Sequence, residues 1–271
     1  MKMAEDVVDI AAYFDRIGYK GAARPTLDTL QELHLLHPLA IPFENLDPLL
    51  GRPVSLDLPS LQAKLVEGRR GGYCYEHNIL FMHMLQELGF EVSGLGARVL
   101  WNRPEGALTP RTHMLLRVDI DGETWIADVG FGGVTLTAPL RLVEGVVQET
   151  PHERFRLDRV EGYWLLQVEI GEEWRSTFRF GLEENLLSDY EIASYFVSTH
   201  QQSHFVHTLM AARPTREGRY ALSNNRLSFR GPEAFQRELA SPDEVEQVLR
   251  DIFGIHVPMG LAQALEREEL L

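Results

Sequence analysis

The sequence predicts an α+β fold in which a helical part, a β-rich part and a mixed part follow one another along the chain. Apolar residues recur at helical spacing as far as Leu88. From Gly94 onward, runs of alternating apolar and polar residues are separated by turn residues, and helical and strand patterns mix after Gly181. A chain of 271 residues can bury a sizeable core as one large domain or as two to three smaller ones.

Four helices are expected in the first part. Pro25 and Thr26 are a start signal for the second of them, and Pro38 is expected to end it. The segment that follows is bounded by Pro42 and Pro48 and is expected to be a loop, neither helix nor strand. The four helices are expected over residues 7–17, 27–36, 58–66 and 76–88, with Gly89 closing the last.

Successive β-hairpins are expected in the middle part. Asp121-Gly122 and Glu161-Gly162 are two of the turn signals between the runs. Hairpins without intervening helices are typical of an antiparallel meander or a small barrel. The strands are expected over residues 95–101, 112–120, 123–131, 155–160, 163–170 and 173–180. In the last part we expect a helix over 189–196, strands over 219–222 and 226–229 joined at Asn224-Asn225, and a helix over 242–253.

Composition and charge exclude several classes of protein. With 26 basic and 40 acidic residues the net charge is −14, which argues against a general binder of nucleic acid or of anionic membranes. No apolar stretch approaches the roughly 20 residues that span a bilayer, and the acidic start of the chain lacks a secretory signal. The single cysteine excludes an intrachain disulfide and suits a reducing compartment. We therefore expect a cytoplasmic protein.

The only cysteine, Cys74, follows two glycines and directly precedes the predicted helix over 76–88. Gly71 and Gly72 let the backbone turn sharply, which would place the thiol at the helix N-terminus. The peptide dipoles there favour a thiolate over a thiol. Taken alone, a lone cysteine is more often a small buried apolar residue, so Cys74 is at this stage only a candidate nucleophile.

The hairpin at Asp121-Gly122 brings a histidine and a carboxylate together. A two-residue turn there pairs Val118 with Trp125 and continues the register toward both open ends. Because side chains alternate, His113 and Asp128 then share a face as diagonal neighbours about 7–8 Å apart, which suits an imidazole–carboxylate hydrogen bond. A slip by one residue would turn the apolar face into solvent, so the register is well specified.

If Cys74 docks at this hairpin, the three residues form a papain-like Cys-His-Asp triad. Cys74 would be the nucleophile, His113 the base, and Asp128 the group that fixes the tautomer and stabilises the imidazolium. The order Cys, His, Asp along the chain matches that of papain-like and transglutaminase-like thiol enzymes.

The remaining histidines give only a weak indication of a metal. His77 lies three residues after Cys74 and could approach the thiol, but no second cysteine or further ligand set is near it in the sequence. His200, His204 and His207 fall within eight residues, yet no carboxylate accompanies them, and local hydrogen bonding is the better interpretation. We therefore expect no metal site.

Three motifs together resemble those of a known family. Residues 70–78 read Arg-Gly-Gly-Tyr-Cys-Tyr-Glu-His-Asn, residues 112–114 read Thr-His-Met, and residues 128–133 read Asp-Val-Gly-Phe-Gly-Gly. These segments resemble the arylamine N-acetyltransferases, and residues 73–78 are most similar to actinobacterial members. Segments 41–47 and 198–205 also look like family motifs, so the resemblance spans about residues 43–205. Many relatives have leucine at the position of His77.

The resemblance implies a three-domain fold: a helical bundle over residues 1–92 that carries the nucleophile, a β-barrel over 93–187 that carries His113 and Asp128, and an α/β lid over 188–271. It implies acetyl-CoA-dependent N-acetylation of arylamines and arylhydrazines, and O-acetylation of N-hydroxyarylamines, through an acetyl-cysteine in a ping-pong mechanism. It also implies a small-molecule acceptor and coenzyme A as partners. We expect no nucleic-acid or membrane partner, and the oligomeric state, monomer or homodimer, stays open.

The resemblance further assigns residues to the site. Cys74, His113 and Asp128 match the family triad. Glu44 and Arg70 match a buried ion pair that braces the active-site loop. The acceptor pocket of the family is matched by Phe43, Val99, Thr112, Phe131 and Phe205. The phosphates of coenzyme A are not located by any motif, and Arg98, Arg213, Arg216 and Arg219 are candidates by charge alone.

Two other functions stay open at this stage. A thiol hydrolase or transglutaminase-like amidase would share the triad order and would cleave amides without any need for coenzyme A. A partner-binding module with a structural Cys74 would lose nothing measurable when that residue is replaced by serine, and its thiol would react slowly with iodoacetamide.

Overall fold

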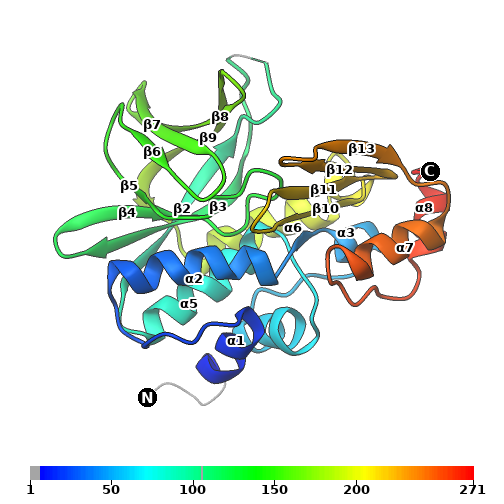
Figure 1. The fold of residues 1–271 in the computed structure, drawn as a ribbon, viewed down its shortest axis with the longest axis horizontal. Helices are drawn as coiled ribbons and strands as arrows, with labels where there is room; N and C mark the ends of the chain where they lie inside the picture. Colours follow the sequence, from blue (N-terminus) through cyan, green and yellow to red (C-terminus); the bar gives the residue numbers. More distant parts are fainter. Residues whose placement is uncertain (1–6, 105) are drawn as a thin grey trace.

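The computed structural model describes residues 7–104 and 106–271, and its N-terminal part is helical (Figure 1). Thr26 caps the second helix by accepting the N–H of Thr29, where the sequence predicted a helix start. Gly89 has φ +88° just beyond the last helix, the left-handed conformation that glycine adopts readily. The helices are α1 (Ile10–Ile17), α2 (Leu27–Ala40), α4 (Leu58–Leu61), its π-helical continuation η2 (Gln62–Glu67), and α5 (Cys74–Glu87).

The prediction that Pro38 ends α2 is wrong, because the helix continues to Ala40. A proline in the last turn gives up only the hydrogen bond that its own N–H would make, and the N–H of Ile41 still donates to the carbonyl of His37 at 2.8 Å. The imidazole of His37 also packs edge-on against Phe81 of α5, at 5.4 Å between ring centroids. Packing against α5 therefore stabilises the last turn.

The segment 41–48, which was predicted to be a loop, contains two short elements. Strand β1 (Phe43–Glu44) pairs antiparallel with β10 (Met210–Pro214) and bridges to Gly72, and helix α3 (Leu46–Leu49) follows directly. A two-residue strand shows no alternation, and its partner lies far away in the sequence. Local pattern alone therefore could not reveal it.

The middle of the chain forms an eight-stranded antiparallel sheet that curls into a nearly closed barrel (Figure 1). Its order is β5-β4-β3-β2-β9-β8-β7-β6. The two end strands are linked by the side-chain amide of Gln148, which bonds both the N–H and the carbonyl of Arg141. The strands are β2 (Glu91–Val99), β3 (Arg111–Ile120), β4 (Glu123–Ala127), β5 (Leu140–Arg141), β6 (Val147–Glu149), β7 (Arg154–Val160), β8 (Tyr163–Ile170) and β9 (Glu173–Glu184). The sequence did not predict β5 and β6, and β4 ends four residues earlier than expected.

A second sheet, of order β1-β10-β11-β12-β13, belongs mainly to the last part of the chain. Asn224 has φ +54° in the predicted turn between β11 and β12. The other elements here are α6 (Leu187–Thr199), the 3₁₀ turn η3 (His204–Val206), β11 (Arg219–Ser223), β12 (Arg226–Arg230), β13 (Phe235–Glu238), α7 (Pro242–Asp251) and α8 (Leu261–Arg267). Of these, η3, β13 and α8 were not predicted, and neither was β10.

Strand β3 separates two of the three hydrophobic cores. Met114 and Leu116 point toward α5 and the N-terminal helices, whereas Leu115 belongs to the interior of the barrel with Phe178. The third core lies in the C-terminal part and also takes in Leu46 and Leu49 of α3. The domain limits at 92/93 and 187/188 stay a prediction. Within residues 7–104 and 106–271, no helix is long and apolar enough to cross a membrane.

Candidate active site

Cys74 is the first residue of α5, two residues earlier than the predicted helix start. The N–H of Tyr73 donates to Glu76 Oε2 at 3.0 Å, which caps the helix beside the thiol. A side chain on Gly71 would collide with the carbonyl oxygen of Pro42, and neither Gly71 nor Gly72 has a positive φ. The glycines therefore permit a close approach of two backbone segments, rather than an unusual backbone angle. Cys74 is 5% exposed, and its Sγ lies 3.8 Å from the carbonyl oxygen of Thr112.

The predicted register of the β3–β4 hairpin is confirmed. Val118 pairs with Trp125 and Leu116 with Ala127, and the turn residue Asp121 has φ +52°. This register places His113 and Asp128 together, with His113 Nε2 2.7 Å from Asp128 Oδ2. Both side chains are almost fully buried, so the pair is shielded from solvent.

The His113–Asp128 pair is held in its ionised form. Burial alone would lower the pKa of His113, but the Asp128 carboxylate and the Cys74 sulfur outweigh it and raise the pKa of His113 to about 10. Burial likewise works against the carboxylate, and the attraction of His113 keeps the pKa of Asp128 below its ordinary value. The imidazole is therefore protonated at neutral pH, next to a cysteine.

The backbone at Gly130 lets the barrel meet the helix that carries the thiol. A methyl group on Gly130 would lie 2.9 Å from the Cα of Cys74 and 3.0 Å from the Cβ of His77. Nε2 of His113 is hydrogen-bonded to Asp128. The hydrogen bond between His113 and Cys74 therefore involves Nδ1. The structure thus brings all three predicted triad residues together.

Three residues without a predicted role support Asp128. Asn78 Nδ2 donates to Asp128 Oδ1 at 3.0 Å, and the N–H of Gly130 donates to the same oxygen at 3.0 Å. The backbone N–H of Asp128 donates to His34 Nε2 at 3.0 Å, and burial lowers the pKa of His34 to about 4. Asn78 lies one helical turn after Cys74, and that spacing was the only signal available for it.

The expected pair of Glu44 and Arg70 is part of a larger buried network. Arg70 Nε is 2.7 Å from Glu44 Oε1, and the N–H of Gly71 donates to the same oxygen. Lys64 continues the network, at 2.6 Å from both Asp47 Oδ2 and Glu76 Oε1. Since Glu76 caps α5, the network connects the loop before Cys74 to the start of its helix. The part of this network that Lys64, Asp47 and Glu76 form was not predicted, because no sequence pattern marks ion pairs drawn from three segments.

The five residues expected to line an acceptor pocket are all half-buried. Phe43 and Phe205 meet edge-on at 6.1 Å, and Phe205 also contacts the ring of Tyr73. Phe131 lies 5.0 Å from the imidazole of His113. The other two follow from the strands: Val99 pairs with Phe178 across β2 and β9, and Thr112 directly precedes His113.

The side chain of His77 is fully buried. Its Nε2 lies within hydrogen-bond distance of the carbonyl oxygens of Pro42 and Gly72, and its Nδ1 is 2.9 Å from His37 Nε2. Burial lowers the pKa of His77 to about 4, so the imidazole is neutral. The side chain links α2, the β1 segment and α5, which is a structural task.

The three histidines near the end of α6 do not converge. His207 Nδ1 pairs with Glu268 at 2.8 Å, His200 accepts the N–H of Gln202, and His204 packs on Phe205. Among the described residues, no group of three or more histidine, cysteine, aspartate or glutamate side chains could hold a metal ion.

The four arginines considered for the phosphates of coenzyme A do not form one cluster. Arg98 donates to the carbonyl of Thr109, and Arg213 to those of Leu39 and Ile252. Arg219 is bound to Glu153 and lines one cavity with Arg216, and neither arginine is bonded to Arg98 or Arg213.

Comparison with known proteins places this arrangement in a family. A family model described as N-acetyltransferase matches residues 26–262. An arylamine N-acetyltransferase of Escherichia coli is 46% identical over 248 residues, which cover 90% of this chain and 88% of the relative. The Salmonella typhimurium arylamine N-acetyltransferase / N-hydroxyarylamine O-acetyltransferase is 42% identical and is covered to 88%, with 91% of this chain aligned.

A solved structure gives the same result. The Mycobacterium marinum arylamine N-acetyltransferase in complex with CoA superimposes with a TM-score of 0.92 at 42% identity, covering 96% of this chain and 99% of that one. Similarity of this extent includes both sheets and the helical part, so the multidomain α+β fold is shared throughout. The chain belongs to the arylamine N-acetyltransferase family.

Proposed function

We propose that this chain transfers the acetyl group of acetyl-CoA to arylamines and arylhydrazines through an acetyl-cysteine at Cys74. The observation that carries the proposal is the contact of Cys74, at the start of α5, with a buried imidazole that Asp128 keeps protonated. A thiolate beside an imidazolium is nucleophilic at neutral pH, whereas a free thiol is ionised to only a few per cent. Family membership supports this assignment, and the relative of known structure was solved with CoA.

In the first half-reaction the Cys74 thiolate attacks the carbonyl carbon of the acetyl thioester. The bond from that carbon to the sulfur of coenzyme A breaks, and the departing thiolate takes the proton from His113. Asp128 holds Nε2 of His113 throughout, so Nδ1 is the atom that gives up the proton. The products are acetyl-Cys74, neutral His113 and free coenzyme A.

In the second half-reaction the amine nitrogen attacks the acetyl-cysteine, and neutral His113 accepts the proton that this nitrogen loses. The carbon–sulfur bond to Cys74 breaks, an amide is released, and the thiolate–imidazolium pair is restored. Arylamines are weak bases and present a free lone pair at neutral pH, whereas alkylamines are mostly protonated. This difference is a physical reason for an aromatic acceptor.

We assign the acceptor site to Phe43, Val99, Thr112, Phe131 and Phe205. The half-buried Phe205 packs on Tyr73 and the half-buried Phe131 packs on His113, and both can offer ring faces and edges to a flat aromatic amine. Glu44 and Arg70 are assigned to structural support of the loop before Cys74, together with Lys64.

The same acetyl-cysteine can be attacked by the oxygen of an N-hydroxyarylamine. The Salmonella relative, 42% identical, has N-hydroxyarylamine O-acetyltransferase in its name, and this favours O-acetylation as a second activity of this chain.

The test is to mix the protein with acetyl-CoA and no amine. We expect about one coenzyme A to be released per Cys74, and one acetyl group to be added at that residue in a peptide mass spectrum. Adding an arylamine should then remove the acetyl group and form the amide. Cys74→Ser is the matched control and should give neither result. An intact protein that releases no coenzyme A would contradict the proposal.

A further inference from the structure

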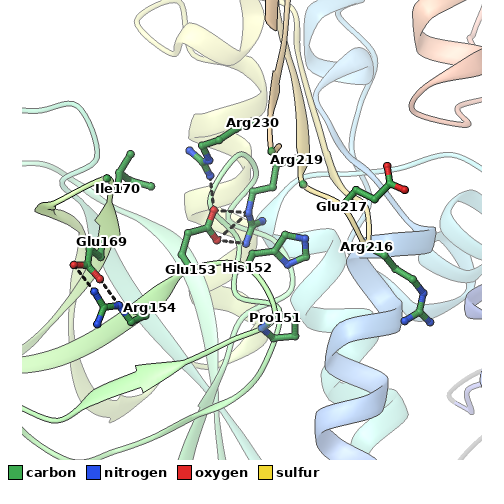
Figure 2. A pocket seen from close by; sticks show the side chains of 13 residues that line it. Pro151, His152, Glu153, Arg154, Glu169, Ile170, Arg216, Glu217, Arg219 and Arg230 are labelled. Atoms are coloured by element: carbon green, nitrogen blue, oxygen red, sulfur yellow. Dashed lines mark hydrogen bonds and ion pairs between the residues drawn. The ribbon is translucent and has the colours of Figure 1, made fainter. Parts of the chain in front are cut away.

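A cavity of about 450 Å³ lies between the ends of β7 and β8 and the C-terminal sheet (Figure 2). Two ion-paired carboxylates line it. Among residues 7–104 and 106–271, Glu169 pairs with Arg154 alone, whereas Glu153 lies between the guanidinium groups of Arg219 and Arg230. Of these two carboxylates, Glu153 is the one whose arginines are hydrogen-bonded to the loop after Asp128.

Glu153 uses both carboxylate oxygens to hold the two arginines. Arg219 Nε is 2.9 Å from each oxygen and its Nη2 is 2.6 Å from Oε2, while Arg230 Nη2 is 2.7 Å from Oε1. Arg219 has a side chain only 3% exposed, and burial lowers its pKa while Glu153 opposes that shift. A buried guanidinium requires such a counter-charge.

Both arginines also bind the loop that follows Asp128. Arg219 Nη2 donates to the carbonyl of Thr135 at 2.8 Å, and Arg230 Nη2 donates to that of Gly133 at 3.3 Å. Within the loop, Thr135 Oγ1 accepts the N–H of Phe131 and donates to the carbonyl of Asp128, both at 3.2 Å. Glu153 is therefore connected to Phe131 through two hydrogen-bonded residues.

We propose that Glu153 is a positioning residue for the acceptor site: through Arg219 and Arg230 it fixes the loop 131–135, and with it the ring of Phe131. This inference rests on the proposed function, which places Phe131 against the acceptor. The carboxylate of Asp128 is held separately, by Asn78, by the N–H of Gly130 and by His113. Glu153 therefore acts on the acceptor step and leaves the thiolate–imidazolium pair alone.

The experiment measures the two half-reactions of Glu153→Gln separately. The variant removes the counter-charge of two arginines, and the loop loses its fixed position. We expect the discharge of acetyl-Cys74 by an arylamine to fall about tenfold in kcat/KM, mainly through KM, because a small misplacement of a positioning group is costly. Release of coenzyme A from acetyl-CoA, and the pH profile of Cys74 alkylation by iodoacetamide, should stay within about twofold of the parent.

Glu169→Gln is the matched control. It makes the same chemical change at a carboxylate that lines the same cavity and pairs with an arginine, but its pair with Arg154 does not touch the loop. Both half-reactions of this variant should stay within about twofold of the parent. Thermal melting of each variant checks the fold. If Glu153→Gln does not fold, Arg230→Gln is tested in its place. It removes only the half-exposed arginine of the pair and should slow the discharge of acetyl-Cys74 by an arylamine about threefold.

The outcomes separate the possibilities. A loss confined to acceptor discharge supports the positioning role. An equal loss in both half-reactions would show a purely structural role and would overturn the positioning role. Unchanged discharge of acetyl-Cys74 in Glu153→Gln, or in Arg230→Gln if the first variant does not fold, would also overturn it. A parent protein that alkylates rapidly at Cys74 but releases no coenzyme A would overturn the proposed function, and the positioning role with it.

Discussion

The substitution Asp128→Asn tests the electrostatic core of the site. The pKa of His113 is raised from 6.5 to about 10, and at 1.36 kcal/mol for each pKa unit this corresponds to about 5 kcal/mol of preference for the imidazolium. Asparagine keeps the shape of the side chain but removes its charge. Because burial then dominates, the pKa of His113 should fall to its ordinary value or below, and the Cys74 thiolate loses its charged partner at pH 7.

The assay follows Cys74 directly. In the parent protein, His113 stays protonated between about pH 6 and pH 9, so the rate of alkylation by iodoacetamide should show no inflection from this imidazole in that range. In Asp128→Asn the imidazole loses the charge that keeps it protonated, so the rate of alkylation at pH 7 should fall below that of the parent. Release of coenzyme A at pH 7 should fall by at least ~10²-fold, because the carboxylate that keeps His113 protonated has lost its charge.

Asp119→Asn is the control on the same hairpin. Asp119 also pairs with a cation, Arg117, but it is 26% exposed and makes no contact with the site among the described residues. Its alkylation profile should match that of the parent. Asp128→Asn with a parental profile, and coenzyme A release within tenfold of the parent at pH 7, would refute the assignment of Asp128.

Three further outcomes follow from the packing. Gly130→Ala would place a methyl group 2.9 Å from the Cα of Cys74, so we expect a loss of about 1–3 kcal/mol in unfolding by urea and slower alkylation of the thiol. Lys64→Met leaves the buried carboxylate of Glu76 without its cation and Asp47 with Arg70 alone, and it should cost about 3–5 kcal/mol in the same assay. Lys20→Met, at an 80% exposed side chain, should change stability by less than about 0.5 kcal/mol. The pKa of His77 is about 4 in the folded state and 6.5 ordinarily, so its contribution to stability is full above pH 7 and is lost as the pH falls. The free energy of unfolding of the parent should therefore drop between pH 7.5 and pH 5, and His77→Gln should make that drop smaller by about 2 kcal/mol.

The parts of the site that sequence could predict are those set by short-range rules. The turn at Asp121-Gly122 and the alternation of β3 were enough to place His113 beside Asp128, and both residues lie as the register requires. The start of α5 was predicted to within two residues because Gly71 and Gly72 mark it. The approach of Cys74 to this pair was a hypothesis, because it depends on packing between a helix and a barrel.

The parts that sequence could not predict are those where weak local signals are decided by distant partners. Strand β1 has two residues and exists because β10 pairs with it. Pro38 stays helical because the turn that contains it packs on α5. Lys64 joins Asp47 to Glu76 across three segments, and nothing in the spacing of these residues indicates a network. Local propensity is a weak prior where tertiary contacts dominate.

The carboxylate and the backbone carbonyl of Asp128 are held by different parts of the chain. Its carboxylate is fixed by residues close to the thiol: Asn78 on the helix of Cys74 and the N–H of Gly130. Its carbonyl is bonded to Thr135, which is bonded in turn to Arg219 of the C-terminal sheet, and the partner of Arg219, Glu153, belongs to the barrel. Nucleophile activation can therefore be preserved while the C-terminal sheet changes, and the acceptor side of the site can vary without loss of the thiolate.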